Sequence, residues 1–256
     1  MNQPFTVSVK NLSDGNELHI VDIESITSDL KNCIDSKLIK ICEGNVSTDL
    51  QLVKNRVIKF LTTKKGSTTE LGAIAEFFIH LYLNQIGFEP QFLYLNLEEG
   101  SIKKGFDGYY SHIEEEWILE SKSGSISTSG ISHISKVKES YTDLEEKLAG
   151  NVKNNPWRNA YNHANLRDVG ATDTVLGNIK ALSDMYASGI FQDIAEFNII
   201  PGSTIFLDGN WESSNIAEIE TEINNEVSNF SFKKVCIICV TKRSRDLFWD
   251  YLNQTT

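Results

Sequence analysis

The sequence has few cysteines, few prolines and no long apolar run. Of its 256 residues, four are Cys and four are Pro. No run approaches the roughly 20 apolar residues of a membrane-spanning helix, and no apolar N-terminal segment resembles a signal peptide. This pattern predicts a cytoplasmic protein that does not enter a membrane.

Two of the cysteines, Cys236 and Cys239, form a Cys-x-x-Cys pattern that is also found in zinc half-sites. They lie in the apolar run 235–240, which is typical of a buried strand. Positions three apart on a strand face opposite sides, so these two thiols are poorly placed to share one metal. The spacing favours buried free thiols, and Cys33 and Cys42 have no comparable close spacing.

Several familiar catalytic motifs are missing. The sequence contains no Gly-x-x-x-x-Gly-Lys-Ser/Thr phosphate loop, no strand-linked Gly-x-Gly-x-x-Gly and no Gly-x-Ser-x-Gly elbow. His112, His133 and His163 lack metal-ligand spacing and are typical of surface or hydrogen-bonded histidines. Nucleotide hydrolysis, dinucleotide redox chemistry and serine hydrolysis are therefore unsupported.

Basic residues are absent from residues 181–232, which hold nine acidic residues. That segment carries −9 of the net charge of −11, whereas residues 50–69 hold five basic residues and no acidic one. An acidic segment of this kind is typical of a solvated face. The alternative is a surface that faces a partner and keeps nucleic acid on the opposite side.

Hydrophobic periodicity predicts a mixed α/β protein, and no internal domain boundary is evident within residues 1–256. Expected strands are 5–9, 18–23, 90–97, 105–110, 117–122, 196–207 (broken by Pro201-Gly202) and 234–241. Expected helices are 48–61, 67–85, 129–148, 157–166, 172–188, 214–228 and 245–252, while 26–42 is ambiguous, with a helix from Ser28 as one option. The portion 181–256 begins with the acidic segment.

The most informative stretch is residues 103–124, which predict two strands joined by an acidic turn at 114–116. Glu120 and Lys122 interrupt the second, apolar strand. Residues two apart on a strand share a face, so these two side chains point the same way. Asp107 joins them if its strand pairs with theirs. The sequence thus predicts two carboxylates and an ammonium group on one face.

The preceding helix, residues 67–85, is almost wholly apolar but carries Glu76 and His80 four residues apart. Glu70 is explained as a helix cap in the sequence Ser-Thr-Thr-Glu. A buried carboxylate needs a partner or a metal, because removing an unpaired charge from water costs several kcal/mol. Two roles remain for Glu76, namely a pair with His80 and a carboxylate of a functional site.

This order of residues resembles the PD-(D/E)XK nuclease superfamily. The matching positions are Glu76 on the helix, Asp107 in Gly-Phe-Asp-Gly, and Glu120 with Lys122 in Glu-Ser-Lys, before the helix expected at 129–148. Phe106 stands where many members have Pro. The resemblance covers residues 67–150 and implies a restriction-endonuclease-like core, a mixed central sheet flanked by helices, with N- and C-terminal additions.

A closer resemblance rests on Gly-Phe-Asp-Gly, Trp-x-x-Glu-x-Lys and the long amphipathic helix that follows. This string is similar to the nuclease subunit of Hachiman-type and Abp-type anti-phage defence systems, which acts with a superfamily 2 helicase. The resemblance implies a helicase partner, and the acidic residues 181–232 are the candidate surface for it.

The residue types suit metal-assisted hydrolysis of a phosphodiester bond, and the resemblance implies DNA as the substrate. Asp107 and Glu120 are oxygen ligands of the kind that Mg²⁺ or Mn²⁺ prefers; the Ser121 carbonyl could add another, and Glu76 could bind a second ion or orient water. Lys122 could position the water or stabilise the phosphate in the transition state. Possible phosphate contacts are Lys103, Lys104, Lys136 and Lys138, although each alone is typical of a surface lysine.

Two alternatives to an enzyme remain open. The chain could be a nuclease-fold subunit that binds without catalysis. It could also be an adaptor in which Glu120 and Lys122 form an ordinary ion pair on one strand face.

Overall fold

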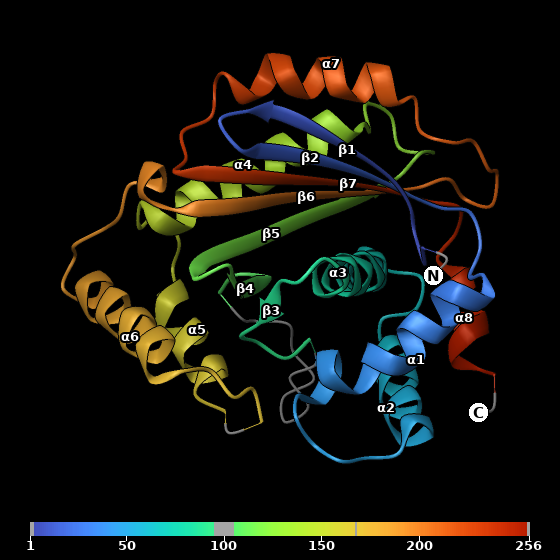
Figure 1. Ribbon diagram of the computed structural model, residues 1–256, viewed down its shortest axis with the longest axis horizontal. Helices are drawn as coiled ribbons and strands as arrows, with labels where there is room; N and C mark the ends of the chain where they lie inside the picture. The colour runs from blue at the N-terminus through green and yellow to red at the C-terminus, as the bar shows by residue number, and fades with distance from the viewer. Residues whose placement is uncertain (1–2, 95–104, 167, 255–256) are drawn as a thin grey trace.

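The computed structural model describes residues 3–94, 105–166 and 168–254 (Figure 1). A seven-stranded sheet with the order β1-β2-β7-β6-β5-β4-β3 runs through the protein. Its strands are β1 (Thr6–Ser13), β2 (Asn16–Ile23), β3 (Glu89–Pro90), β4 (Gly108–His112), β5 (Glu115–Ser125), β6 (Asn198–Phe206) and β7 (Lys234–Lys242). Strands β2, β7, β6 and β5 are parallel to one another, whereas β1, β4 and β3 pair in antiparallel fashion at the two sides.

Eight α-helices in the described part of the chain cover the two faces of the sheet (Figure 1). They are α1 (Ser28–Glu43), α2 (Leu50–Thr62), α3 (Thr68–Gln85), α4 (His133–Leu148), α5 (Pro156–Ala164), α6 (Asp173–Ala187), α7 (Ile216–Val227) and α8 (Asp246–Leu252), and a short 3₁₀ helix spans Ile194–Glu196. None of the described helices is long and apolar enough to cross a membrane. The mixed α/β class predicted from the sequence is confirmed.

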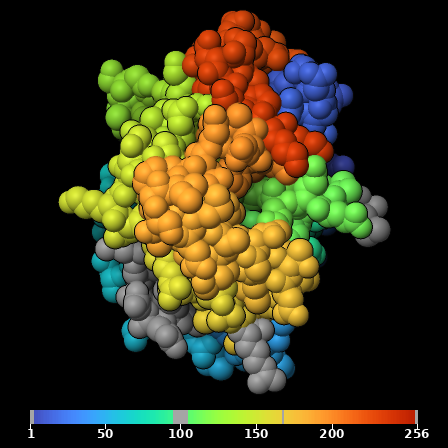
Figure 2. Space-filling view, turned by 90° about the vertical axis from the view of Figure 1, so that its left-hand side faces the viewer, coloured from blue at the N-terminus to red at the C-terminus, as the bar shows by residue number. Residues whose placement is uncertain are grey.

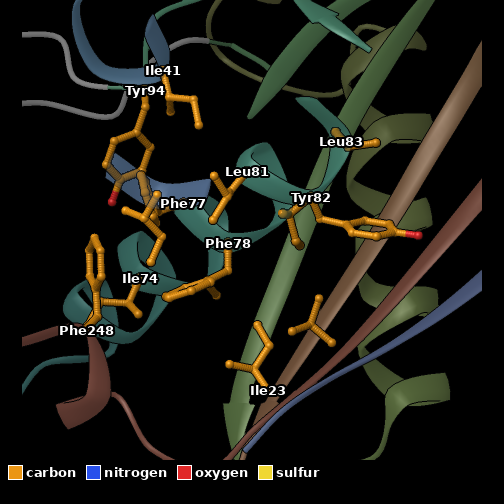
Figure 3. Packing of buried hydrophobic residues seen from close by; sticks show 14 of the residues in the cluster. Ile23, Ile41, Ile74, Phe77, Phe78, Leu81, Tyr82, Leu83, Tyr94 and Phe248 are labelled. Atoms are coloured by element: carbon orange, nitrogen blue, oxygen red, sulfur yellow. The ribbon is translucent and has the colours of Figure 1, made fainter. Parts of the chain in front are cut away.

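Two buried hydrophobic clusters lie on opposite faces of the sheet. Helices α1, α2, α3 and α8 form the first cluster, and helices α4 to α7 contribute to the second. In the first, Phe248 of α8 stacks on Phe77 of α3 with ring centroids 4.6 Å apart, beside Phe78 (Figure 3). Because α3 is buried on nearly all sides, its apolar sequence lacks the one-sided stripe of a surface helix.

The start of α3 is fixed by its own first residues and by a side chain of α8. The Ser67 hydroxyl accepts a hydrogen bond from the Glu70 N–H, as expected of a cap. The Glu70 carboxylate accepts from the Gly66 N–H at 2.6 Å and from the Trp249 indole at 2.7 Å. Glu70 therefore caps the helix and also ties it to α8.

The predicted strand 90–97 is wrong over residues 91–94, and its last three residues lie outside the described ranges. Strand β3 contains only Glu89 and Pro90. The chain then leaves the sheet because Tyr94 is held elsewhere: its N–H donates to the Ile41 carbonyl and its hydroxyl to the Ala73 carbonyl. Tyr94 thus packs against α1 and α3, whereas Phe92 packs in the other cluster against Tyr109 and His163.

Two further expectations about the strands need correction. The turn between β4 and β5 is formed by Ile113 and Glu114, both at positive φ, so Glu115 and Glu116 belong to β5. Strand β6 is not broken at Pro201, which pairs with Glu120 of β5. Its pairing with β7 skips Ile200 and Pro201 and resumes in the same register, which accommodates the missing proline N–H.

Gly105 lies shortly before β4, in a backbone conformation that excludes a side chain. Its φ is +86°, and a Cβ atom would lie 2.4 Å from the Pro156 carbonyl oxygen. We expect Gly105→Ala to lower the free energy of unfolding by about 2 to 4 kcal/mol, from left-handed strain plus overpacking. Gly66 also has positive φ but open space around it, so Gly66→Ala should cost only about 1 kcal/mol. If Gly105→Ala and Gly66→Ala lowered the free energy of unfolding in urea by the same amount, the close approach of Gly105 to Pro156 would be contradicted.

Candidate functional site

Asp107 lies just before β4, beside the stretch of β5 that contains Glu120. Gly108 is the register partner of Leu119, and the Asp107 N–H donates to the Leu119 carbonyl at 3.0 Å. Asp107 therefore stays hydrogen-bonded to β5 just before β4 begins. The Asp107 carboxylate accepts hydrogen bonds from Ser121, at 2.9 Å from the backbone N–H and 3.0 Å from the hydroxyl. Ser121 therefore fixes the orientation of Asp107.

Glu120 is buried in the middle of β5, with 3% of its side chain exposed. Each of its oxygens meets a lysine: Lys122 Nζ lies 3.2 Å from Oε1, and Lys147 Nζ lies 2.5 Å from Oε2. The Ser140 hydroxyl of α4 donates to the Glu120 backbone carbonyl. Glu120 and Lys122 share the face that packs against α4.

Helix α4 supplies two charged residues that were not expected from the sequence. Asp143 accepts hydrogen bonds from Lys122 and forms an ion pair with Lys147 at 3.4 Å. With Ser140, these residues follow the spacing of one helix face. That spacing is visible in the sequence, but an Asp and Lys four apart are also common on a solvated helix surface.

Burial and neighbouring acids raise the pKa values of Asp107 and Glu120, whereas neighbouring lysines lower them. Burial raises the pKa of Asp107, and the charge of Glu76 raises it further. Burial and then Asp107 raise the pKa of Glu120 well above its ordinary value, although Lys147 and Lys122 oppose this. The two acids therefore carry unfavourable charge in a site of low polarity.

Lys122 of β5 and Asp143 of α4 behave differently from these two acids. Burial alone would lower the pKa of Lys122, but Glu120 and Asp143 reverse the effect and raise it, so Lys122 is a cation at neutral pH. Burial would raise the pKa of Asp143, but hydrogen bonds with Glu120 and Lys122 and the charge of Lys147 lower it. Asp143 is thus an ionised partner that anchors Lys122.

Glu76 lies on α3 with 5% of its side chain exposed. Its carboxylate is 3.2 Å from His80 Nε2, and His80 Nδ1 is hydrogen-bonded to the Tyr110 hydroxyl. The charge of Glu76 also raises the pKa values of Asp107 and Tyr110. Glu76 therefore pairs with His80 and at the same time lies near the β4 end of the site.

The carboxylates suit a hard divalent cation by chemistry but are not gathered around one point. In the described ranges, the one trio of His, Cys, Asp or Glu with ligand atoms all within 4.8 Å is Glu17, His19 and Cys236. Glu76, Asp107 and Glu120 are therefore spread more widely than this, and lysines hold both oxygens of Glu120. An ion would fit this site if Glu120 exchanged a lysine contact for it, which would also relieve the repulsion between the acids.

The lysines expected to contact phosphate lie in three different settings. Lys136 is on the same α4 face as Asp143 and Lys147 but pairs with Glu139 at 2.5 Å. Lys138 faces α7, where it pairs with Glu226 at 3.0 Å. Lys103 and Lys104 lie outside the described residues.

A comparison with protein families matches the HamA family model to residues 7–248. The chain belongs to the HamA family. This is the protein A family of the Hachiman anti-phage system. The HamA match extends well beyond residues 67–150 and includes β1, β2, β6 and β7. No curated protein matches the chain.

Proposed function

We propose that this HamA-family protein is a Mg²⁺-dependent nuclease of the PD-(D/E)XK type that cuts DNA in anti-phage defence. The observation that carries the proposal is the register of β4 and β5. It brings the half-buried Asp107 carboxylate beside the Glu120–Lys122 segment of β5, where the Ser121 N–H and hydroxyl hold it and its charge raises the pKa of the buried Glu120 carboxylate. Nothing in the packing of an ordinary sheet calls for such a costly group of charges.

Asp107 and Glu120 would hold the ion, with Glu76 available for a second ion or for a water molecule. When bound, Mg²⁺ or Mn²⁺ lowers the pKa of water and neutralises charge on the phosphate oxygens. Ser121, considered from the sequence as a carbonyl ligand, donates its N–H and hydroxyl to Asp107 and thereby orients it. It contributes by keeping that carboxylate in place.

Lys122 would stabilise the negative charge that develops on the phosphate. It is a cation at neutral pH, and Asp143 fixes its position. Lys147 offsets the charge of Glu120 at 2.5 Å in the absence of an ion. Electrostatic groups that are already oriented need little reorganisation in the reaction, which is why such an arrangement is effective.

A superfamily 2 helicase is the proposed partner, and residues 181–232 are the proposed surface for it. The side of the protein shown in Figure 2 is formed largely by α6, the segment after it and the segment before β7 (yellow to red). Of the acids on α7, Glu218 is exposed, whereas Glu220 and Glu226 pair with Lys10 and Lys138 of this chain. Lysines of this chain therefore neutralise only part of the negative charge on this surface.

The test is a cleavage assay on DNA with Mg²⁺ or with a chelator, using the protein alone and together with the helicase. We expect Mg²⁺-dependent cleavage that falls by at least about 100-fold in Glu120→Ala and in Lys122→Ala. The matched control is Glu146→Ala, an exposed acid of α4, which should keep activity.

One observation favours a second function, binding without catalysis. Lys122 and Lys147 already occupy both oxygens of Glu120, which would make the charges a self-contained network. In that case no cleavage would occur under any condition, while DNA or helicase binding would persist in Glu120→Ala. This outcome would overturn the nuclease proposal.

A further inference from the structure

A second group of metal-binding side chains lies across β2 and β7. Glu17 and His19 belong to β2, and Cys236 belongs to β7. One ligand atom from each lies within 4.8 Å of the others, and no other trio of His, Cys, Asp or Glu in the described ranges meets this limit. The three residues combine an oxygen, a nitrogen and a sulfur ligand.

The sheet register explains why residues so distant in sequence meet. Glu17 is the parallel register partner of Cys236, and His19 lies two residues beyond Glu17. All three side chains therefore point to the same face. This is the face that packs against α3, since Cys236 belongs to the cluster formed by α3, whereas Cys239 belongs to the opposite cluster. Glu120, which packs against α4, faces the other way.

His19 is already oriented by both of its ring nitrogens. Its Nδ1 lies 2.6 Å from the Tyr82 hydroxyl, and its Nε2 lies 3.0 Å from Glu17 Oε2. Figure 3 shows the Tyr82 side chain projecting from α3 with its hydroxyl end away from the helix. Metal-bound histidines typically hold their second nitrogen in such a hydrogen bond, which fixes the ring orientation. Tyr82 thus leaves Nε2 to face Glu17.

Cys236 has no part in the proposed nuclease site. It is a free thiol and is 4% exposed. Burial, with the nearby charge of Glu17, raises the pKa of the thiol, so it is protonated at neutral pH. A bound cation would reverse this preference, because metal coordination deprotonates a thiol.

A groove gives solvent access to Glu17 and Cys236. It has a volume of about 570 Å³ and is lined in part by Gly15, Glu17, His112, Glu114, Lys234 and Cys236. It lies at the end of the sheet where the parallel strands β2, β5, β6 and β7 begin. On the side shown in Figure 2, the blue β1–β2 hairpin, the red segment before β7 and the green β4–β5 hairpin come together there.

We propose that Glu17, His19 and Cys236 bind one divalent transition-metal ion of the Zn²⁺ class. His19 Nε2, the Cys236 thiolate and a Glu17 oxygen are the protein ligands, and the fourth position faces the groove. Thiolate and imidazole favour Zn²⁺ over Mg²⁺, which prefers oxygen ligands. The ion joins β2 to β7 and, on binding, releases the thiol proton to solvent. This site is independent of the proposed nuclease activity.

The test uses Co²⁺ as a spectroscopic probe on metal-stripped protein in a thiol-free reducing buffer. We expect one Co²⁺ per chain with a thiolate-to-cobalt charge-transfer band, and displacement of Co²⁺ by Zn²⁺. Cys236→Ser should abolish the band. Cys239→Ser is the matched control and should keep it, because Cys239 faces the other side of the sheet. Glu120→Ala should also keep the band, since a site of carboxylates alone gives none.

Two milder variants each change one polar group, the first on a ligand and the second on the residue that orients His19. Glu17 is 46% exposed, so Glu17→Gln should fold normally and weaken Zn²⁺ binding. Tyr82→Phe should weaken it by roughly 10- to 100-fold through loss of the hydrogen bond to His19. The proposal is overturned if wild type shows no charge-transfer band. It is also overturned if Cys236→Ser keeps the band, or if Glu17→Gln leaves the Zn²⁺ affinity unchanged.

Discussion

Lys242→Met is expected to raise the free energy of unfolding by about 2 to 4 kcal/mol at pH 7. Lys242 ends β7 and is fully buried. Its ammonium nitrogen has no hydrogen-bond partner among the described residues and lies 4.1 Å from the centre of the Phe78 ring. A contact with an aromatic face recovers only part of the cost of removing an ammonium group from water. Methionine keeps the shape of the side chain without the charge.

The same residue predicts a pH dependence. Burial lowers the pKa of Lys242 from 10.5 to about 7. Between these values the unfolded chain holds a proton that the folded chain has lost. The unfolded state therefore binds more protons, and the stability of wild type should rise relative to Lys242→Met as the pH increases from about 7 to 10.5. Urea unfolding of both proteins across this range measures the difference.

Lys54 provides the control for this prediction, because it is also fully buried but has partners. Its ammonium nitrogen lies 3.7 Å from Asp35 and 3.5 Å from the Gln254 carbonyl, and over the ring of Tyr251. Lys54→Met would leave Asp35 with a weaker set of partners and should reduce stability. A loss of stability in both variants would show that Lys242 has a stabilising partner.

The sequence was most informative where local periodicity decides the geometry. Alternation along a strand placed Glu120 and Lys122 on one face, and they lie 3.2 Å apart. The cap at Ser67, expected from the sequence Ser-Thr-Thr-Glu, follows from an equally local preference. These features depend on residues a few positions apart, so no knowledge of the tertiary fold was needed.

Contacts between distant segments were not predictable in this way. The lysine nearest to Glu120 Oε2 is Lys147, which belongs to the next helix, whereas Lys138 two turns earlier faces α7. Likewise, Cys236 meets His19 only because β7 inserts beside β2 in the sheet. The predicted turn at 114–116 was wrong at Glu116 for a related reason. Glu116 fits in a strand because Tyr109 and Asn178, which are distant in sequence, donate hydrogen bonds to its carboxylate.

Asp107→Asn is expected to stabilise the metal-free protein while removing its proposed activity. Asparagine has nearly the same volume and keeps an oxygen that can accept the hydrogen bonds from Ser121. It removes a negative charge that is unfavourable at this position, because partial burial and the charge of Glu76 raise the pKa of Asp107. We expect the free energy of unfolding at pH 7, measured with urea and a chelator, to rise by about 1 to 2 kcal/mol. DNA cleavage should fall by at least about 100-fold.

Asp143→Asn is the control: it makes the same chemical change but should alter the free energy of unfolding in the opposite direction. Asp143 has a lowered pKa because hydrogen bonds with Glu120 and Lys122 and the charge of Lys147 outweigh its burial. Its charge therefore stabilises the fold, and its removal should reduce stability by about 1 to 2 kcal/mol. If both variants lost stability, Asp107 would belong to a self-contained ionic network. A gain for Asp107→Asn with loss of cleavage would instead mean that the charge is kept for function at the expense of stability.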